Sequence, residues 1–268
     1  MNKIKIARLK YCLSIILNSD VVRVLIFLAV QISLPYPVVA ASNDKAEFPE
    51  INMSLPSLSL DVLSTGTLAK VETSQFFLTT TGAQVTEFPV HVALGFDEKN
   101  QELMVEFEFL NDQYLEQNNY VDDNSAMWNQ EVFEMFISSG ADTPERYMEV
   151  QLNPNGALFS AWVINPNGIG TKNTIDFFDG HGAGIKASVV KEQNAWSGKI
   201  LLPLSIFETM RGEYRLNMFR IASLQPHDKS TQWGCTATSC AFLAWSPTFS
   251  GATPEFHIPE YFGHLYLK

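Results

Sequence analysis

The sequence predicts an all-β protein that folds as a single-domain antiparallel β-sandwich. Short runs of β-branched and aromatic residues recur along the chain, and Gly, Pro, Asn or Asp bounds each run. About nine such runs follow one another with turns every 8 to 15 residues, which is typical of a sandwich. No segment shows the apolar periodicity of a helix of ordinary length.

The strands are expected between residue 88 and the C-terminus. The first pair covers residues 88–94 and 102–110, on either side of the turn Asp97-Glu98-Lys99-Asn100. The only helical element expected is a turn or two over residues 205–211, with Ser205 as its N-cap. The remaining strands are expected at residues 131–138, 146–152, 158–164, 184–190, 195–203, 215–223 and 262–267.

The first 41 residues are expected to be a signal peptide, because basic residues precede an apolar run over residues 24–34 and the small residues Ala40 and Ala41 follow it. The run is short and ends at two prolines, so we expect no stable membrane span. An uncleaved signal anchor is the alternative. Residues 42–64 are expected to form a linker or an N-terminal arm, and residues 65–268 the domain of a secreted or periplasmic protein.

The net charge and the cysteine content limit which partners and metal sites the sequence predicts. The chain has 18 Lys and Arg against 29 Asp and Glu, a net charge of −11, so nucleic acid is not an expected partner. Cys12 lies in the predicted signal peptide. Cys235 and Cys240 remain in the exported chain, where we expect them to form a disulfide; no further ligands for a metal lie near them in the sequence.

Two charged residues interrupt apolar strands. Glu134 lies in Val132-Phe133-Glu134-Met135-Phe136, and Arg220 lies in a similar run after Asn217. An unpaired buried charge is costly, so the structural interpretation is an internal ion pair between Glu134 and Arg220. The functional interpretation is that Glu134 faces a pocket and accepts hydrogen bonds from ligand hydroxyls.

The tryptophans divide into two groups. Trp128 and Trp245 lie where strands meet loops, so each is either a core residue or a platform for the apolar face of a sugar ring. Trp162 and Trp196 lie within predicted strands and are expected in the core. Trp233, next to Cys235, fits either role.

Several segments resemble those of a known family and follow one another in the same order along the chain. The segment Trp128-Asn129-Gln130-Glu131-Val132-Phe133-Glu134 looks like the W-x-x-D-x-x-E opening of family 9 carbohydrate-binding modules and their DOMON-like relatives. Residues 196–204 (WSGKILLPL), 216–220 (LNMFR), 243–246 (LAWS) and 256–267 (FHIPEYFGHLYL) follow in the order of those modules. The resemblance spans residues 85–268, and the closing segment is its most specific part.

The resemblance implies a sandwich that clamps a sugar between Trp128 and Trp245, with hydrogen bonds from Glu134 and Asn217. It also implies calcium as a structural ion in some members. The sequence departs from the family at two positions. Glu131 replaces the usual Asp, and Glu149 stands on a strand where sugar-binding members can carry an arginine. Arg220 would then neutralise Glu149 or Glu134, and the pocket would prefer a different ligand.

The expected function is non-catalytic recognition of a polysaccharide or oligosaccharide in carbohydrate catabolism. The carboxylates Glu131, Glu134 and Glu149 leave open a hydrolase acting on O-glycosyl compounds. A haem-binding DOMON domain would need an axial ligand from among Met127 and the histidines, none of which has a signature spacing. An interaction or structural protein is the remaining alternative. No cofactor and no metal site are expected, although calcium is possible at Asp112, Asp122, Asp123, Asn118, Asn119 and Asn124, a segment otherwise interpreted as a solvated acidic loop.

Overall fold

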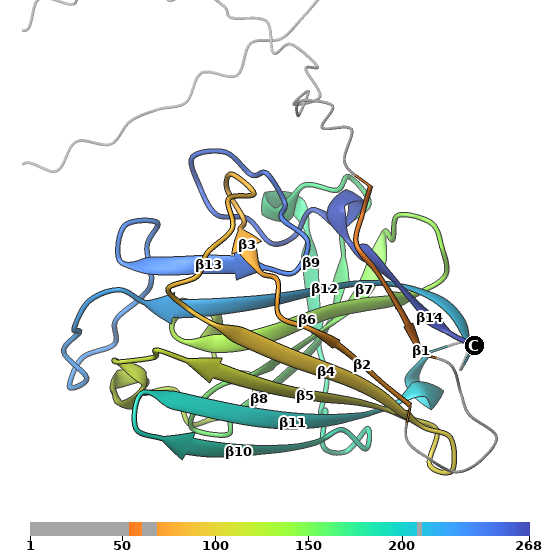
Figure 1. The fold of residues 1–268 in the computed structure, drawn as a ribbon, viewed down its shortest axis with the longest axis horizontal. Coiled ribbons are helices and arrows are strands. Elements are labelled where there is room, and N and C mark those ends of the chain that lie inside the picture. The colour runs from red at the N-terminus through yellow and green to blue at the C-terminus, as the bar shows by residue number, and fades with distance from the viewer. Residues whose placement is uncertain (1–53, 61–68, 208–210) are drawn as a thin grey trace, which may run out of the picture. The chain divides into compact units, whose positions relative to one another are not determined.

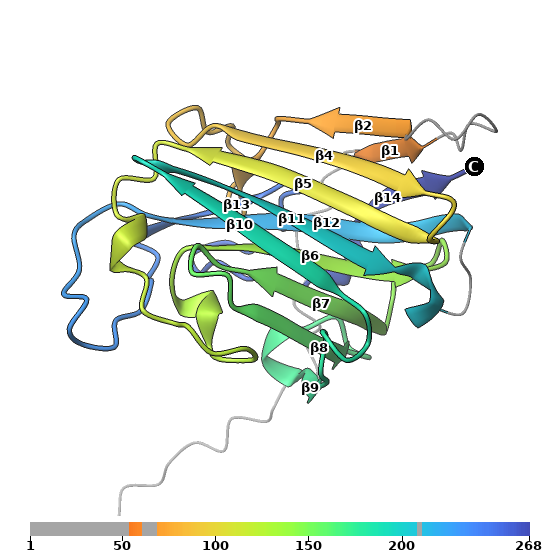
Figure 2. The same cartoon turned by 90° about the horizontal axis from the view of Figure 1, so that it is seen from below.

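Two β-sheets lie face to face in the computed structural model (Figures 1 and 2), which describes residues 54–60, 69–207 and 211–268. These residues all belong to one compact unit. In Figure 2, β4, β5 and β11 lie in one layer and β6, β7 and β8 in the other. The predicted all-β sandwich is confirmed.

The larger sheet contributes the strands that position the candidate site. Apart from the parallel pair β1 and β14, its neighbouring strands are antiparallel. Its order is β1 (Ser57–Leu60), β14 (Gly263–Leu267), β12 (Gly212–Ser223), β6 (Val132–Ser139), β7 (Arg146–Leu152), β8 (Leu158–Ile164) and β9 (Thr174–Phe177), with β13 (Cys240–Ala244) paired to β12 and β3 (Phe77–Leu78) paired to β13.

The smaller sheet is entirely antiparallel. Its order is β10 (Lys186–Glu192), β11 (Ala195–Pro203), β5 (Glu102–Leu110), β4 (Val90–Asp97) and β2 (Ala69–Thr73). Trp196 on β11 packs edge-on against Phe107 and Phe109 in the core between the sheets, as predicted.

Each strand of the larger sheet has one face toward the smaller sheet and one face away from it, because side chains alternate along a strand. On β6, Phe133 and Met135 belong to the apolar cluster that both sheets share. Phe136 and Val132 belong to a second cluster on the outer face. Glu134 lies between these two residues in the alternation and therefore projects from the outer face.

All nine predicted strands are present, with ends shifted by a few residues. Five further strands, β1, β2, β3, β9 and β13, were not predicted. Because β1 lies within the segment predicted to be a linker or arm, the sheet begins before residue 65, where the domain was expected to start. The expected helical segment over residues 205–211 overlaps a short 3-10 turn at Leu204–Ile206, and residues 208–210 lie outside the described residues.

Cys235 and Cys240 form the predicted disulfide. The predicted signal peptide, residues 1–41, lies outside the described residues. Within the part of the chain that the structure describes, no helix combines the length and the hydropathy needed to cross a bilayer.

Candidate functional site

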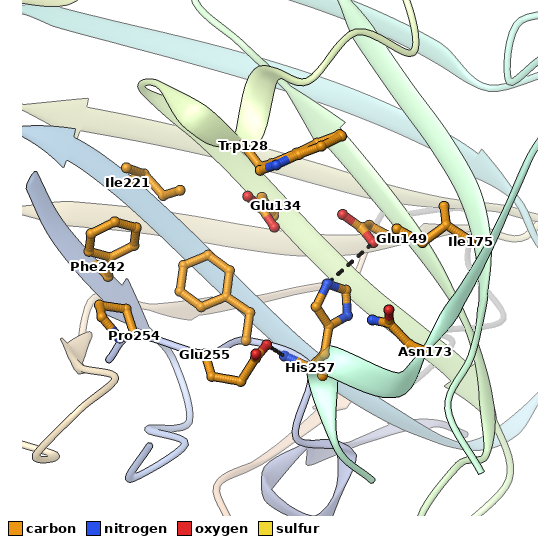
Figure 3. Close-up of a pocket in the computed structure, with 12 residues that line it drawn as sticks. Trp128, Glu134, Glu149, Asn173, Ile175, Ile221, Phe242, Pro254, Glu255 and His257 are labelled. Carbon is orange, nitrogen blue, oxygen red and sulfur yellow. Dashed lines mark hydrogen bonds and ion pairs between the residues drawn. The ribbon is translucent and has the colours of Figure 1, made fainter. Parts of the chain in front are cut away.

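A cavity of about 290 Å³ opens on the outer face of the larger sheet (Figure 3). Strands β6, β7, β9, β12 and β13 form its floor and sides, and the loops before β6, before β9 and after β13 complete it. The lining residues are Trp128, Glu134, Glu149, Gly170, Asn173, Ile175, Ile221, Phe242, Pro254, Glu255, Phe256 and His257.

Trp128 provides an aromatic surface at the cavity. It lies on a 3-10 turn, Met127–Asn129, that the fully buried Met127 anchors to the outer apolar cluster. The Trp128 ring meets Phe159 edge-on, with ring centroids 5.5 Å apart, and the residue remains 37% exposed. A fixed and partly exposed indole of this kind can cover one face of a ring-shaped ligand.

Glu134 brings a carboxyl group to the floor of the cavity. The residue is 2% exposed, and its Oε1 atom has no hydrogen-bond partner among the described residues. Burial raises the pKa of Glu134 well above its usual range, and the neighbouring carboxylates of Glu149 and Glu255 raise it further. A buried polar atom without a partner is unusual in a folded protein, so this oxygen is available to a ligand.

Glu149 on β7 brings a second carboxyl group to the same space. It is 3% exposed, and one of its oxygens accepts a hydrogen bond from the amide of Gln151. The other oxygen, Oε2, lies 4.0 Å from Nε2 of His257 and accepts no hydrogen bond within the described residues. Burial raises the pKa of Glu149 to about 7, although the bond from Gln151 opposes this effect.

Hydrogen bonds to its backbone N–H, its backbone carbonyl and its ring hold His257 in place. Its Nδ1 atom lies 2.9 Å from the Tyr147 hydroxyl, and its backbone N–H donates to Glu255 over 2.9 Å. Asn165 donates to the same hydroxyl and to the carbonyl of His257. In the neutral tautomer that carries its hydrogen on Nε2, toward Glu149, Nδ1 accepts a hydrogen bond from the Tyr147 hydroxyl. Burial lowers the pKa of His257 to about 4, so this neutral form holds at pH 7.

The side chains of Glu134, Glu149 and His257 point toward a common space, with the Trp128 ring beside the Glu134 carboxyl (Figure 3). Apolar side chains of Ile221 and Phe242 close one side of this space. The arrangement offers one aromatic face and several polar atoms at the base of a small cavity, a combination suited to a ligand that is apolar on its faces and polar at its edge.

The structure does not bring Trp245 to this cavity. Trp245 is 3% exposed and belongs to the apolar cluster between the sheets. Its ring lies against Gly263, where even a Cβ atom would collide with it. The two-tryptophan clamp that the family resemblance implied is therefore not formed.

Asn217 and Arg220 also lie away from the cavity. The Asn217 side chain donates to the carbonyl of Ser246 over 2.8 Å and accepts from the Ser246 N–H over 3.0 Å, so it joins β12 to the segment after β13. In the antiparallel register Glu134 is opposite Phe219, and Arg220 is opposite Phe133. Arg220 thus projects from the face opposite to that of Glu134.

The predicted ion pair between Glu134 and Arg220 is wrong. Arg220 pairs with the buried Asp112, with 3.4 Å between Nη2 and Oδ2. It donates to the carbonyls of Pro89 and Leu110 over 3.0 and 2.9 Å, and its guanidinium lies over the Phe109 ring. Glu131 belongs to this buried cluster rather than to the cavity, and burial together with Asp112 raises the pKa of Glu131 well above its usual range.

Most of the residues considered for calcium have other partners. Asp112 pairs with Arg220, while Asp123 and Asn124 accept hydrogen bonds from backbone N–H groups of β8. Asn118 donates to the carbonyl of Glu131. Across residues 54–60, 69–207 and 211–268, no three His, Cys, Asp or Glu side chains gather in a way that could hold a metal ion.

No role was predicted for Asn173, Phe242 or Glu255, and His257 was considered only as part of the closing motif and as one of the histidines. These residues come from separate segments, and only the packing of the loops brings them together. Of the histidines weighed as haem ligands, His257 is the one that lines the cavity.

Comparison with known proteins gives a fold and a distant relative. The sequence matches no protein-family model. An extracellular protein of Arthroderma benhamiae is 34% identical over 110 residues, which cover 36% of this chain and 48% of that protein. The chain therefore spans about half the length of this curated relative.

Among solved structures, a candidate carbohydrate-binding protein from Bacteroides uniformis aligns with a TM-score of 0.55 and 16% identity, over 80% of this chain and all of its own. A family 9 carbohydrate-binding module from Caldicellulosiruptor kristjanssonii, solved with glucose, aligns with a TM-score of 0.48 and 13% identity, over 80% of this chain and 96% of its own. The first of these shows that the sandwich fold is shared. The predicted resemblance is thereby confirmed at the level of the fold.

Proposed function

We propose that the protein is an exported carbohydrate-binding protein that recognises a polysaccharide or oligosaccharide without cleaving it and serves carbohydrate catabolism. The Trp128 ring would cover the C–H face of a pyranose, and Glu134, Glu149 and His257 would hydrogen-bond its hydroxyls. The observation that carries this proposal is the pairing of an exposed indole with buried carboxyl oxygens that lack partners in the same cavity. The candidate carbohydrate-binding protein that shares this fold supports it.

Buried carboxyl groups suit this role because they bind hydroxyls in either protonation state. An ionised carboxylate accepts strong hydrogen bonds, and a protonated carboxyl both donates and accepts. With its hydrogen on Nε2, the neutral His257 would add a donor next to Glu149. A sugar edge presents donors and acceptors alternately, so it can satisfy all three groups.

A screen of oligosaccharides and polysaccharides, followed by calorimetric titration of the strongest ligand, tests the proposal. Glu134→Gln should weaken binding by ~1 to ~2 kcal/mol, roughly 5- to 30-fold, because the amide keeps the shape but loses the carboxyl. Glu106→Gln is the matched control, since Glu106 pairs with Lys70 and Lys199 on the smaller sheet, outside the cavity. Parental affinity in Glu134→Gln, or no ligand in the screen, would contradict the proposal.

Export is a separate part of the proposal. The disulfide and the extracellular relative support it, because disulfides persist in oxidising compartments. The mature protein should begin at Ala41 or Ser42, which intact mass spectrometry would show. A mature protein that retains Met1 would contradict this expectation.

A further inference from the structure

The cavity has an unbalanced set of charged groups. Three carboxyl groups line it, from Glu134, Glu149 and Glu255, and no Lys or Arg is among its lining residues in the described part of the chain. The one basic side chain in the lining, His257, is neutral at pH 7 because burial lowers its pKa to about 4. Cations from the protein therefore do not compensate these acids within the cavity.

Two of the three carboxyl groups are deeply buried and incompletely bonded. Glu134 and Glu149 are 2% and 3% exposed, and each has an oxygen without a hydrogen-bond partner among the described residues. Two buried carboxyl groups in one space repel each other when both ionise, and each pays for lost hydration. Without a ligand they relieve this cost by binding protons. A cation placed between them would relieve it more completely.

The surroundings favour an organic cation over a metal ion. The cavity of about 290 Å³ is much larger than an ion needs, and Trp128, Ile175, Ile221 and Phe242 give it apolar walls. The described residues contain no cluster of acidic or histidine side chains arranged to hold a metal. A ligand that fits has an apolar ring face for Trp128, hydroxyls for the polar rim and a positive group for the carboxyls.

We infer that the cavity is selective for an amino sugar with a free, protonated amine, as a single unit or within an oligosaccharide. This inference rests on the proposed function, because it assumes that a pyranose ring stacks on Trp128. The ammonium group would lie between Glu134 and Glu149 and donate to their unpartnered oxygens. We attribute the selectivity to Glu149, because it adds a second buried acid to the cavity that Glu134 lines.

The test uses three trisaccharides that differ at one substituent on each ring. Glucosamine trisaccharide carries an amine at C2, its N-acetylated form an acetamide, and cellotriose a hydroxyl. Calorimetric titration at about pH 6, where the amine is protonated, should show the amine form binding at least ~10-fold more tightly than the other two. Binding should also release protons from the carboxyl groups, which titrations in buffers of different ionisation enthalpy would reveal.

Two variants distinguish the cavity from general attraction to an acidic protein, which also favours a cationic sugar. Glu149→Gln should reduce the ratio of amine to hydroxyl affinity by ~5-fold or more, whereas Glu106→Gln, the same substitution on the other sheet, should keep the parental ratio. Equal ratios in the two variants would assign the preference to the surface and overturn the inference.

The trisaccharide series also separates this inference from the proposed function. If cellotriose binds as tightly as the amine form, and Trp128→Ala abolishes its binding, the selectivity is wrong while the sugar site stands. If none of the three trisaccharides binds, the selectivity is again wrong, and the wider glycan screen decides the proposed function independently.

Discussion

Replacing Trp128 separates a binding tryptophan from a core tryptophan. Trp128 is 37% exposed, so of the ~250 Å² that a tryptophan can bury, ~90 Å² remains for a ligand to cover. At ~25 cal/mol per Å², covering this surface contributes ~2 kcal/mol. Trp128→Ala should therefore weaken binding of the strongest screened glycan by ~30-fold in calorimetric titration.

The stability of Trp128→Ala should change little by comparison. The ring contacts Phe159 edge-on but does not enter the core between the sheets, so we expect a loss of ~1 to ~2 kcal/mol in urea unfolding. Trp245→Ala is the matched control, because Trp245 is 3% exposed within that core. It should lose ~3 to ~5 kcal/mol of stability, while the molecules that remain folded keep the parental affinity.

Two results would refute this reasoning. If Trp128→Ala binds like the parent protein, the exposed indole is not part of the sugar site. If Trp245→Ala loses affinity as strongly as Trp128→Ala at temperatures where it is folded, a two-tryptophan clamp must form in solution. Trp245→Phe provides the same comparison should the alanine variant fail to fold.

Three further predictions concern stability, each measured by urea unfolding. Arg220→Met should cost ~3 to ~5 kcal/mol because it leaves Asp112 buried without its cation, whereas Arg211→Met, at a half-exposed ion pair, should cost less than ~1 kcal/mol; equal losses would contradict the buried pair. Cys235→Ser should cost ~2 kcal/mol, as closure of so short a loop implies, and a reductant should have the same effect on the parent protein but none on the variant. Burial raises the pKa of Glu149 to about 7, whereas the same carboxyl in the unfolded chain releases its proton near pH 4.5. The unfolded state therefore gains free energy from ionisation before the folded state does, and the free energy of unfolding falls as the pH rises from about 4.5 to about 7. The stability of Glu149→Gln relative to the parent should therefore rise across that range by up to ~3 kcal/mol, and a constant difference would contradict the shift.

The strands that were predicted differ from those that were not in how strongly their own residues favour a strand. Long runs such as β5 and β12 are rich in apolar residues and were predicted from the sequence alone. In contrast, β1 reads Ser-Leu-Ser-Leu after a proline and resembles a linker, and its partner β14 lies near the opposite end of the chain. The exposed edge strand β9 is similarly short. Their structure depends on tertiary pairing rather than on local preference.

The candidate site was predictable where a motif placed a residue next to a strand, as with Trp128 and Glu134. The error over Arg220 has a geometric cause. Pairing Glu134 with Arg220 considered charge alone, whereas the register puts Phe219 opposite Glu134 and turns Arg220 to the other face. Sequence alternation shows which residues of one strand share a face, but it does not give the register between two strands. Only the fold supplies that.

Buried acids on the two faces of the larger sheet differ in whether a cation of the chain lies beside them. Toward the core, Asp112 receives the Trp196 N–H over 2.9 Å and pairs with Arg220, so the chain itself supplies a cation for this acid. On the outer face, Glu134 and Glu149 share a cavity with no Lys or Arg in its described lining. Burying Glu134 and Glu149 without a cation costs stability and gives no evident benefit to folding. Such acids do benefit a binding site, because a ligand can supply the missing partner. Glutamine at either position should therefore stabilise the protein at neutral pH and weaken ligand binding, opposite effects that packing alone does not produce.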